Sequence, residues 1–249
     1  MAFVYLGSAS GLATTAVWTG EGNQAASDYG IMVNTAGDVN GDGYDDIIVG
    51  ADQFDNGSTD EGQAYVYYGT ATGVASTPAW RGEANQATAY FGYWVSTAGD
   101  VNKDGYADII VAAHWYDNGQ TDEGQVYVYH GSASGLSTTA NWTAESNQAS
   151  SRFGACVSTA GDVNKDGYAD VIVGARMYSN GQTSEGAAFV YHGSASGLAT
   201  TAAWFGESNL ASANYGLIVA NAGDVNKDGY GDVIVGAKNY NNGITAAGR

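Results

Sequence analysis

The sequence is poor in cysteine, proline and basic residues, and it has no long apolar run. Its single cysteine, Cys156, excludes a disulfide within the chain, although bound metal could provide the same stabilisation in a secreted protein. Only 8 lysines and arginines stand against 26 acidic residues, and the net charge of −18 argues against binding to nucleic acid, whose phosphates require basic surfaces. No run of about 18 apolar residues is present, so we predict no insertion into a membrane. The N-terminus also lacks the charged and apolar regions of a signal peptide.

The abundant residues indicate β-structure. The chain has 37 glycines and 18 tyrosines but only one proline, Pro78, a mixture typical of strands joined by tight turns rather than of helices. Hydrophobic residues make up 44% of the chain, which argues against disorder. The acidic excess has two common sources, a solvating surface or carboxylates held in place for cations.

Four segments of the sequence align without gaps at a spacing of 62 residues. The segment Gly37-Asp38-Val39-Asn40 recurs in each of them, and so does one tryptophan. The units are approximately residues 2–63, 64–125, 126–187 and 188–249, and we predict that together they form one domain, residues 2–249. Because four units account for every residue except Met1, we expect an excised or engineered piece of a longer array.

Each unit is predicted to contain four short strands. Examples are residues 91–95 after an aromatic-Gly pair, 46–50 in a β-branched run, 125–130 in an alternating run and 79–83 around the tryptophan. Four short strands in a unit of this size are typical of a β-propeller blade, so the predicted fold class is all-β.

The two ends of the chain predict how the ring closes. The chain stops where the other units continue into their third strand, and it starts at Ala2-Phe3-Val4-Tyr5, which is that missing strand. We therefore expect the N-terminal strands to complete the C-terminal blade, which would remove exposed sheet edges. A closed four-bladed monomer would need wide wedges between blades, whereas these units are rich in alanine and glycine. We favour a homodimer in which two chains form an eight-bladed ring, with the four-bladed monomer as the alternative.

An acidic loop, Asp-x-Asn-x-Asp-Gly-x-x-Asp, occurs once in every unit. Calcium takes six to eight oxygen ligands, and the side chains at loop positions 1, 3, 5 and 9 with the backbone carbonyl at position 7 can wrap one ion. The predicted ligands are Asp38, Asn40, Asp42, Tyr44 and Asp46; Asp100, Asn102, Asp104, Tyr106 and Asp108; Asp162, Asn164, Asp166, Tyr168 and Asp170; Asp224, Asn226, Asp228, Tyr230 and Asp232. The sequence thus predicts one calcium ion per repeat, four per chain.

The acidic loop also resembles two other structures, an EF-hand and an Asx-rich turn without metal. The loop opens like an EF-hand, but position 12 is a valine such as Val49 rather than a bidentate glutamate, so the aspartate at position 9 has to close the shell. The loop could also be an Asx-rich turn without metal. Three carboxylates within nine residues would repel one another without a cation, and this repetition in four units favours calcium. Magnesium fits less well because it keeps its waters.

The units resemble FG-GAP repeats, the blades of integrin α-subunit propellers and their bacterial relatives. The resemblance rests on Phe91-Gly92 and Phe153-Gly154, with Tyr-Gly in the other units, and on Val49-Gly50-Ala51 and its equivalents, from which Val111-Ala112-Ala113 departs by one residue. It covers the whole chain, although the family's proline is absent. The resemblance implies calcium in the loop between the first two strands of each blade and an extracellular role in adhesion or recognition. Some related fungal propellers are lectins.

Several residues outside the loops are candidates for ligand contacts. His114, Trp115 and Arg176 follow the second strand at positions that vary between otherwise similar units, although drift at an unconstrained surface is the favoured explanation of the variation. The repeated tryptophans could stack on sugar rings, but packing between blades is the favoured interpretation. The Glu-x-Asn-Gln-Ala segments could bind sugar hydroxyls or satisfy backbone groups between blades.

No Gly-rich phosphate loop, serine-centred nucleophile elbow or paired acid–base constellation occurs outside the acidic loops, so we predict that the chain is not an enzyme. We expect a non-catalytic, calcium-stabilised recognition, adhesion or scaffold module of a secreted or cell-surface protein, with a protein or carbohydrate ligand. The alternatives are a lectin with repeated sugar sites and an accessory domain of a larger secreted enzyme.

Overall fold

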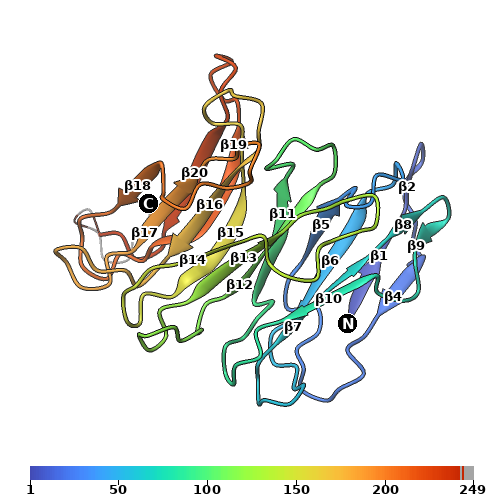
Figure 1. Ribbon diagram of the computed structural model, residues 1–249, viewed down its shortest axis with the longest axis horizontal. Helices are drawn as coiled ribbons and strands as arrows, with labels where there is room; N and C mark the ends of the chain where they lie inside the picture. Colours follow the sequence, from blue (N-terminus) through green and yellow to red (C-terminus); the bar gives the residue numbers. More distant parts are fainter. Residues whose placement is uncertain (242, 244–249) are drawn as a thin grey trace.

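The computed structural model describes residues 1–241 and 243, and these form an open arc of antiparallel sheets (Figure 1). Within this part of the chain there is no helix, and hence none that is long and apolar enough to cross a membrane. The architecture is that of a β-propeller whose blades follow one another along the arc. The all-β fold class predicted from the sequence is therefore confirmed.

Three four-stranded sheets form what we call the first, second and third full blades, each an antiparallel meander. The first blade consists of β5 (Val33–Gly37), β6 (Asp46–Ala51), β7 (Gln63–Tyr67) and β10 (Trp80–Glu83). The second consists of β11 (Trp94–Gly99), β12 (Asp108–Ala113), β13 (Gln125–Tyr129) and β14 (Trp142–Glu145). The third consists of β15 (Phe153–Gly161), β16 (Asp170–Ala175), β17 (Ala187–Tyr191) and β18 (Trp204–Glu207).

A two-stranded sheet stands at each end of the arc. The N-terminal half-blade pairs β1 (Ala2–Val4) with β4 (Trp18–Gly20), and the C-terminal half-blade pairs β19 (Tyr215–Gly223) with β20 (Asp232–Ala237). Two small hairpins project from the turns, β2 (Gly7–Ser8) with β3 (Gly11–Leu12) and β8 (Gly69–Thr70) with β9 (Gly73–Val74).

The second, third and fourth strands of each unit lie where the sequence predicts them, and the first strands β15 and β19 also begin at the aromatic-Gly pair. The first strands of the first and second blades begin later. Residues 91–93 were predicted as strand, whereas β11 begins only at Trp94. Gly92 has φ +85°, and the Tyr93 N–H donates to the Tyr90 carbonyl, so the aromatic-Gly pair forms a turn. A Cβ at Gly50 would lie 2.0 Å from the Gly92 carbonyl oxygen, which explains why glycine occupies both positions.

The hydrophobic core lies between successive blades. Ile48 and Val66 of the first blade pack in one cluster with Val95 and Ile109 of the second, and all four are fully buried. The central strand β12 is buried at every residue, which explains its continuous apolar sequence.

The repeated tryptophans connect each blade to the next, as predicted. The Trp80 indole nitrogen donates to the Ser137 carbonyl at 2.9 Å, and its ring meets the Tyr129 ring edge-on at a centroid distance of 4.8 Å. Trp18 and Trp142 make the same bond to Ala75 and Ala199, each at 3.0 Å. Burial of an aromatic ring and satisfaction of its N–H are thus achieved at three successive boundaries.

Ring closure within the chain is not shown by the structure. In the described residues, β1 pairs only with β4, and β20 pairs only with β19. The two half-blades lie at opposite ends of the arc, because the blades between them do not turn far enough to bring them together (Figure 1).

Both ends of the arc expose apolar side chains that are buried elsewhere. Ile234 of β20 is 62% exposed, whereas its equivalents Ile48, Ile110 and Ile172 are fully buried. Val33, at the other end, is 54% exposed although Val95 is fully buried. Each end therefore presents the surface that faces a neighbouring blade in the interior of the arc.

Candidate functional site

Each acidic loop joins the first strand of a blade to the second. In the first full blade, β5 ends at Gly37 and β6 begins at Asp46, so all four loops lie at the same edge of their blades. Gly43, at loop position 6, has φ +88°, a conformation that favours glycine and permits the sharp turn.

The aspartate at position 9 fastens its loop to the blade. Asp46 is fully buried, and its two carboxylate oxygens accept the N–H groups of Val39 at 2.9 Å and Gly69 at 2.8 Å. Asp108 and Asp170 repeat both bonds, while Asp232 accepts from Val225 at 2.8 Å. The fourth aspartate sits in a half-blade, which explains why its third-strand partner is missing from the described residues.

Positions 1, 3 and 5 form a compact set of Asx turns. The Asp38 carboxylate accepts the N–H groups of Gly41 at 2.7 Å and Gly43 at 2.8 Å. The Asn40 amide donates to Asp42 at 3.0 Å, and Asp42 accepts the Tyr44 N–H, also at 3.0 Å. The Asx-rich turn predicted as the alternative to a calcium site is therefore present as a local structure in these loops.

The electrostatics of the loops fit a cation. Burial, aided by the charges of Asp42 and Asp38, raises the pKa of Asp46 to about 6. The pKa of Asp108 is raised to about 7 by burial and by its neighbours Asp104 and Asp100. The carboxylates thus lie within one another's fields, and every donor is an oxygen, as calcium requires. Among the described residues, no three acidic, His or Cys side chains converge closely enough to hold a metal as they stand.

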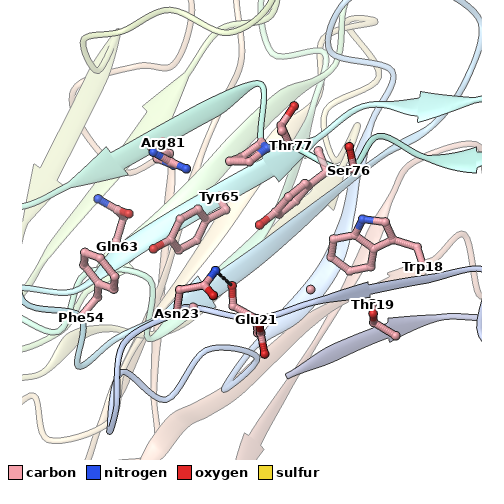
Figure 2. A pocket seen from close by; sticks show the side chains of 14 residues that line it. Trp18, Thr19, Glu21, Asn23, Phe54, Gln63, Tyr65, Ser76, Thr77 and Arg81 are labelled. Atoms are coloured by element: carbon pink, nitrogen blue, oxygen red, sulfur yellow. Dashed lines mark hydrogen bonds between the residues drawn. The ribbon is translucent and has the colours of Figure 1, made fainter.

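Three equivalent grooves lie between the outer strands of neighbouring blades, spaced by 62 residues. Their volumes are about 410, 380 and 270 Å³. The second groove contains Glu83 and Asn85 of one blade and Tyr129 and Thr138 of the next. Figure 2 shows the first groove, where Glu21 and Asn23 lie opposite Gln63 and Tyr65.

Polar side chains in these grooves are held in place by a network. The Glu145 carboxylate accepts the amide groups of Asn118 at 2.7 Å and Gln125 at 3.3 Å, and Glu83 repeats the arrangement. The Gln86 side chain exchanges two hydrogen bonds with the backbone of Asp117, at 2.9 and 2.7 Å. The Glu-x-Asn-Gln-Ala segments therefore satisfy backbone groups between blades, as predicted, and also contribute to the grooves.

The predicted ligand residues His114, Trp115 and Arg176 lie at the opposite edge from the acidic loops, directly after β12 and β16. His114 is only 4% exposed, and its ring stacks on Tyr93 at a centroid distance of 3.8 Å. Arg152, which the sequence did not single out, lies over the Trp115 ring at 3.6 Å. Its position just before an aromatic-Gly pair, where the other units have Asp28, Tyr90 or Asn214, was the available signal.

Asp52 occupies the position of His114 in the first full blade and gives a pH-dependent prediction. It is 5% exposed, and burial, aided by the charges of Asp28 and Asp60, raises its pKa to about 6. Its Oδ1 atom is buried without a hydrogen-bond partner in the described structure. A raised carboxyl pKa in the folded state reduces stability as the pH rises from the unfolded value, near 4, through 6.

We therefore expect Asp52→Asn to be more stable than the parent at pH 8, by about 3 kcal/mol. Urea unfolding of both proteins between pH 4 and 8 measures the difference. The gap should close as the pH falls to about 4, where the parent carboxyl is protonated. A gap that is independent of pH would contradict this account.

The chain matches the FG-GAP repeat over residues 33–67, 91–129, 153–191 and 215–249, more than half of its length. Integrin alpha-V of Gallus gallus is 32% identical over 210 residues, which cover 81% of this chain and 19% of that protein. Integrin alpha-6 of Gallus gallus is 36% identical over 160 residues, with coverages of 62% and 14%. Integrin alpha-IIb of Mus musculus is 36% identical over 161 residues, with coverages of 62% and 15%. The chain thus spans less than a fifth of the length of these relatives.

Among solved structures, the exotype rhamnogalacturonan lyase YesX aligns with a TM-score of 0.48 at 17% identity, over 94% of this chain and 41% of that one.

Proposed function

Because the chain belongs to the FG-GAP repeat family, we propose that it is a non-catalytic, calcium-binding propeller module that serves adhesion or recognition outside the cell. The observation that carries the calcium assignment is the acidic loop, which places oxygen donors at the same edge of successive blades. The similarity to integrin alpha chains supports the adhesive and extracellular part of the proposal.

We assign the ions to the side chains at loop positions 1, 3, 5 and 9 and the carbonyl at position 7 of each loop. When bound, calcium would neutralise the carboxylates. The Asp at position 9 can contribute although it accepts two N–H groups, because each carboxylate oxygen offers about two lone-pair sites. Burial and the hydrogen bond to the third strand fix the side chain of this aspartate before calcium binds. Less side-chain entropy is therefore lost on binding.

Calcium titration followed by calorimetry tests the assignment. We expect four ions per chain for the parent and three for Asp104→Asn, which removes the charge of one loop but keeps an oxygen for the Tyr106 N–H, accepted at 3.1 Å in the parent. A parent that releases no binding heat with millimolar calcium would refute the proposal.

A second candidate function, a lectin, is favoured by the three equivalent grooves. Repeated polar grooves of a few hundred cubic ångströms, lined by Glu, Asn, Thr and Tyr, offer the hydroxyl-directed hydrogen bonds that a sugar needs. Glu145 is pre-oriented by its two amide partners.

If this function is present, a glycan array in the presence of calcium should give hits. Asn147→Gly should then lower the number of sites by one, because it removes an amide from the third groove. Asn147 has φ +55°, which glycine adopts without strain, so the fold should persist. An array without hits would exclude the lectin and leave the calcium proposal intact.

We also propose that the partner of each exposed end of the arc is a second copy of this chain. Completion of each half-blade by its counterpart would give eight blades from two chains.

A further inference from the structure

Two arginines and a histidine gather where the second full blade meets the third. His114 follows β12, Arg176 follows β16, and Arg152 precedes β15. The Met177 N–H donates to the Ser151 carbonyl at 3.1 Å, which holds the backbone beside Arg176 against the backbone beside Arg152. Three separate segments thus converge at the edge of the blades opposite the acidic loops.

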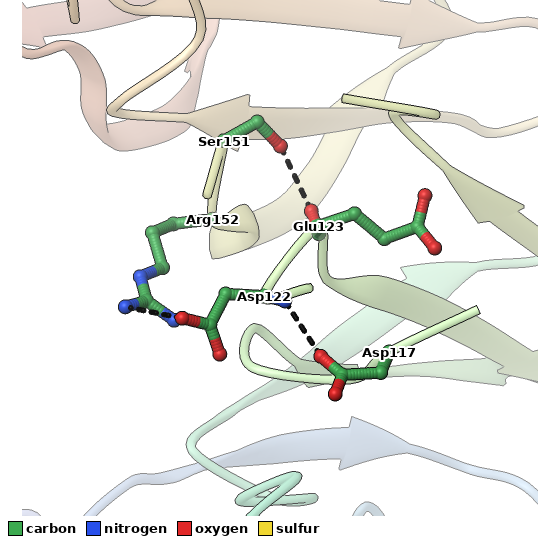
Figure 3. Close-up of polar contacts among 5 residues, drawn as sticks. All are labelled: Asp117, Asp122, Glu123, Ser151 and Arg152. Atoms are coloured by element: carbon green, nitrogen blue, oxygen red, sulfur yellow. Dashed lines mark hydrogen bonds and ion pairs between the residues drawn. The ribbon is translucent and has the colours of Figure 1, made fainter. Parts of the chain in front are cut away.

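Arg152 is held firmly in this cluster. Its side chain is 12% exposed, it pairs with Asp122 at 3.1 Å, and its guanidinium lies over the Trp115 ring at 3.6 Å. In Figure 3 the Asp122 carboxylate points toward Arg152, whereas the Glu123 carboxylate points away. Asp122 is therefore the one carboxylate that pairs with this cluster among the described residues.

Three nitrogens of the cluster have no partner. His114 Nδ1, Arg152 Nη1 and Arg176 Nε are all buried and form no hydrogen bond in the described part of the chain. A buried N–H without an acceptor costs about 1–3 kcal/mol, and more when the group is charged. His114, only 4% exposed, packs against Tyr93 and lies close enough to both arginines to be affected by their charges.

The charges of the cluster are also unbalanced. The positive charges of Arg176 and Arg152 add to burial in lowering the pKa of His114 to about 3, so this imidazole is neutral near pH 7. Asp122 pairs with Arg152, and the more distant Asp117 also acts on Arg152. Arg176 forms no ion pair among the described residues. An arginine without a paired carboxylate is unexpected in a chain with only 8 basic residues and a net charge of −18, and it can take an anion of charge −1.

We propose that Arg152 and Arg176, with His114 behind them, form a binding site for the carboxylate of an acidic side chain in a peptide ligand. Guanidinium groups bind carboxylates through paired N–H donors, and Arg152 Nη1 and Arg176 Nε are the N–H groups that still lack an acceptor among the described residues. A sugar acid fits less well because Arg152 already covers the Trp115 face on which a sugar ring would stack. The inference rests on the recognition role proposed above and names its ligand class.

The chain supplies an internal comparison. At the boundary between the first and second blades, Asp52, Tyr90 and Asp60 stand where His114, Arg152 and Asp122 stand at this one. That boundary has no arginine pair and should bind no carboxylate, so the protein is expected to carry one such site.

The test is a titration of the calcium-loaded chain, observed by NMR at the arginine Nε–H and tryptophan indole signals. The probes are the blocked tripeptide Gly-Asp-Gly, its Gly-Asn-Gly analogue and galacturonate. We expect saturable shifts at Arg152, Arg176 and Trp115 with the Asp peptide and none with the Asn peptide. Arg176→Gln should weaken binding at least tenfold. Arg152→Lys, which keeps the positive charge but loses the paired N–H donors of the guanidinium group, should weaken binding by less. The control Arg81→Gln, at a groove far along the chain, should bind as the parent does.

Equal affinity of Arg176→Gln and parent for the Asp peptide, or an absence of shifts in a chain that binds its calcium, would overturn the proposed site. Saturation by galacturonate but not by the Asp peptide would overturn the assignment to a peptide. Unchanged calcium binding by each variant shows that its fold is intact. Calcium binding is titrated separately. If the proposed function is wrong, the parent chain will not bind calcium; if only this site is wrong, the chain will bind calcium but not the Asp peptide.

Discussion

Removal of calcium with EDTA is expected to lower the Tm of this chain by more than 10 °C. Each ion that binds only the folded state stabilises it by about 2.7 kcal/mol at a concentration 100 times its dissociation constant, and four loops act together. Without the ion, the three carboxylates of each loop repel one another, and in the first loop the charges of Asp42 and Asp38 add to burial in raising the pKa of Asp46. Scanning calorimetry in calcium and in EDTA measures the shift.

Asp104→Asn separates metal binding from the structural role of the loop. It should lose part of the calcium-dependent rise in Tm, because one loop no longer has its full charge. In EDTA it should be at least as stable as the parent, since one repelling charge is gone while the acceptor for Tyr106 N–H remains. Equal Tm values for the parent in calcium and in EDTA would refute the coupling of metal binding to folding.

Light scattering is expected to give twice the 25.6 kDa mass of the chain, because the two-chain ring proposed above pairs the two exposed ends of the arc. Ile110 pairs with Val128 and Ile172 with Val190 in the full blades. The next pair in this 62-residue series joins Ile234 to the equivalent of Val190, which is Val4 of a second chain. The same period places the Ala13 carbonyl of the second chain against the indole of Trp204, which is 41% exposed here although Trp142 is 6% exposed. Association would thus bury apolar surface and pair two free sheet edges.

Ile234→Lys places a charge in that contact and should weaken association at least 100-fold, equivalent to about 2.7 kcal/mol. Thr121→Lys, which adds the same charge to an exposed loop of the second blade, should leave the mass unchanged. A parent mass of 25.6 kDa at every concentration would exclude association. A ladder of larger masses would mean open chains of copies instead of a two-chain ring.

The repeat made most of the fold predictable. Strands such as β6 and β13 were placed correctly because β-branched runs and alternation report directly on burial. The start of β11 was missed because Phe91-Gly92 reads as strand from its composition, whereas positive φ at Gly92 and its approach to Gly50 belong to the contact between units. The curvature of the arc likewise depends on how blades pack, which a periodic pattern does not encode.

The two candidate sites also differ in how far the sequence alone predicts them. The acidic loops are contiguous in sequence, so residues such as Asp38 and Asp46 could be identified with their spacing. The arginine cluster joins Arg152 to Trp115, 37 positions apart in the sequence, and only the fold brings them into contact. The variation of His114 and Arg176 between units indicated the segments after the second strands, but it did not indicate that Arg152 lies beside them.

The tryptophan bonds between blades make the chain a set of linked neighbours, and this governs the order in which it opens. Trp18, Trp80 and Trp142 each bond a carbonyl 57 positions further along, so three of the four boundaries in the arc are fastened by their own indole. Stability in a linear array spreads through adjacent interfaces, so in the separate chain, such as the Ile234→Lys variant, fraying should start at the ends and move inward. Hydrogen exchange of the indole protons would report each boundary separately, with Trp80 and Trp142 exchanging last.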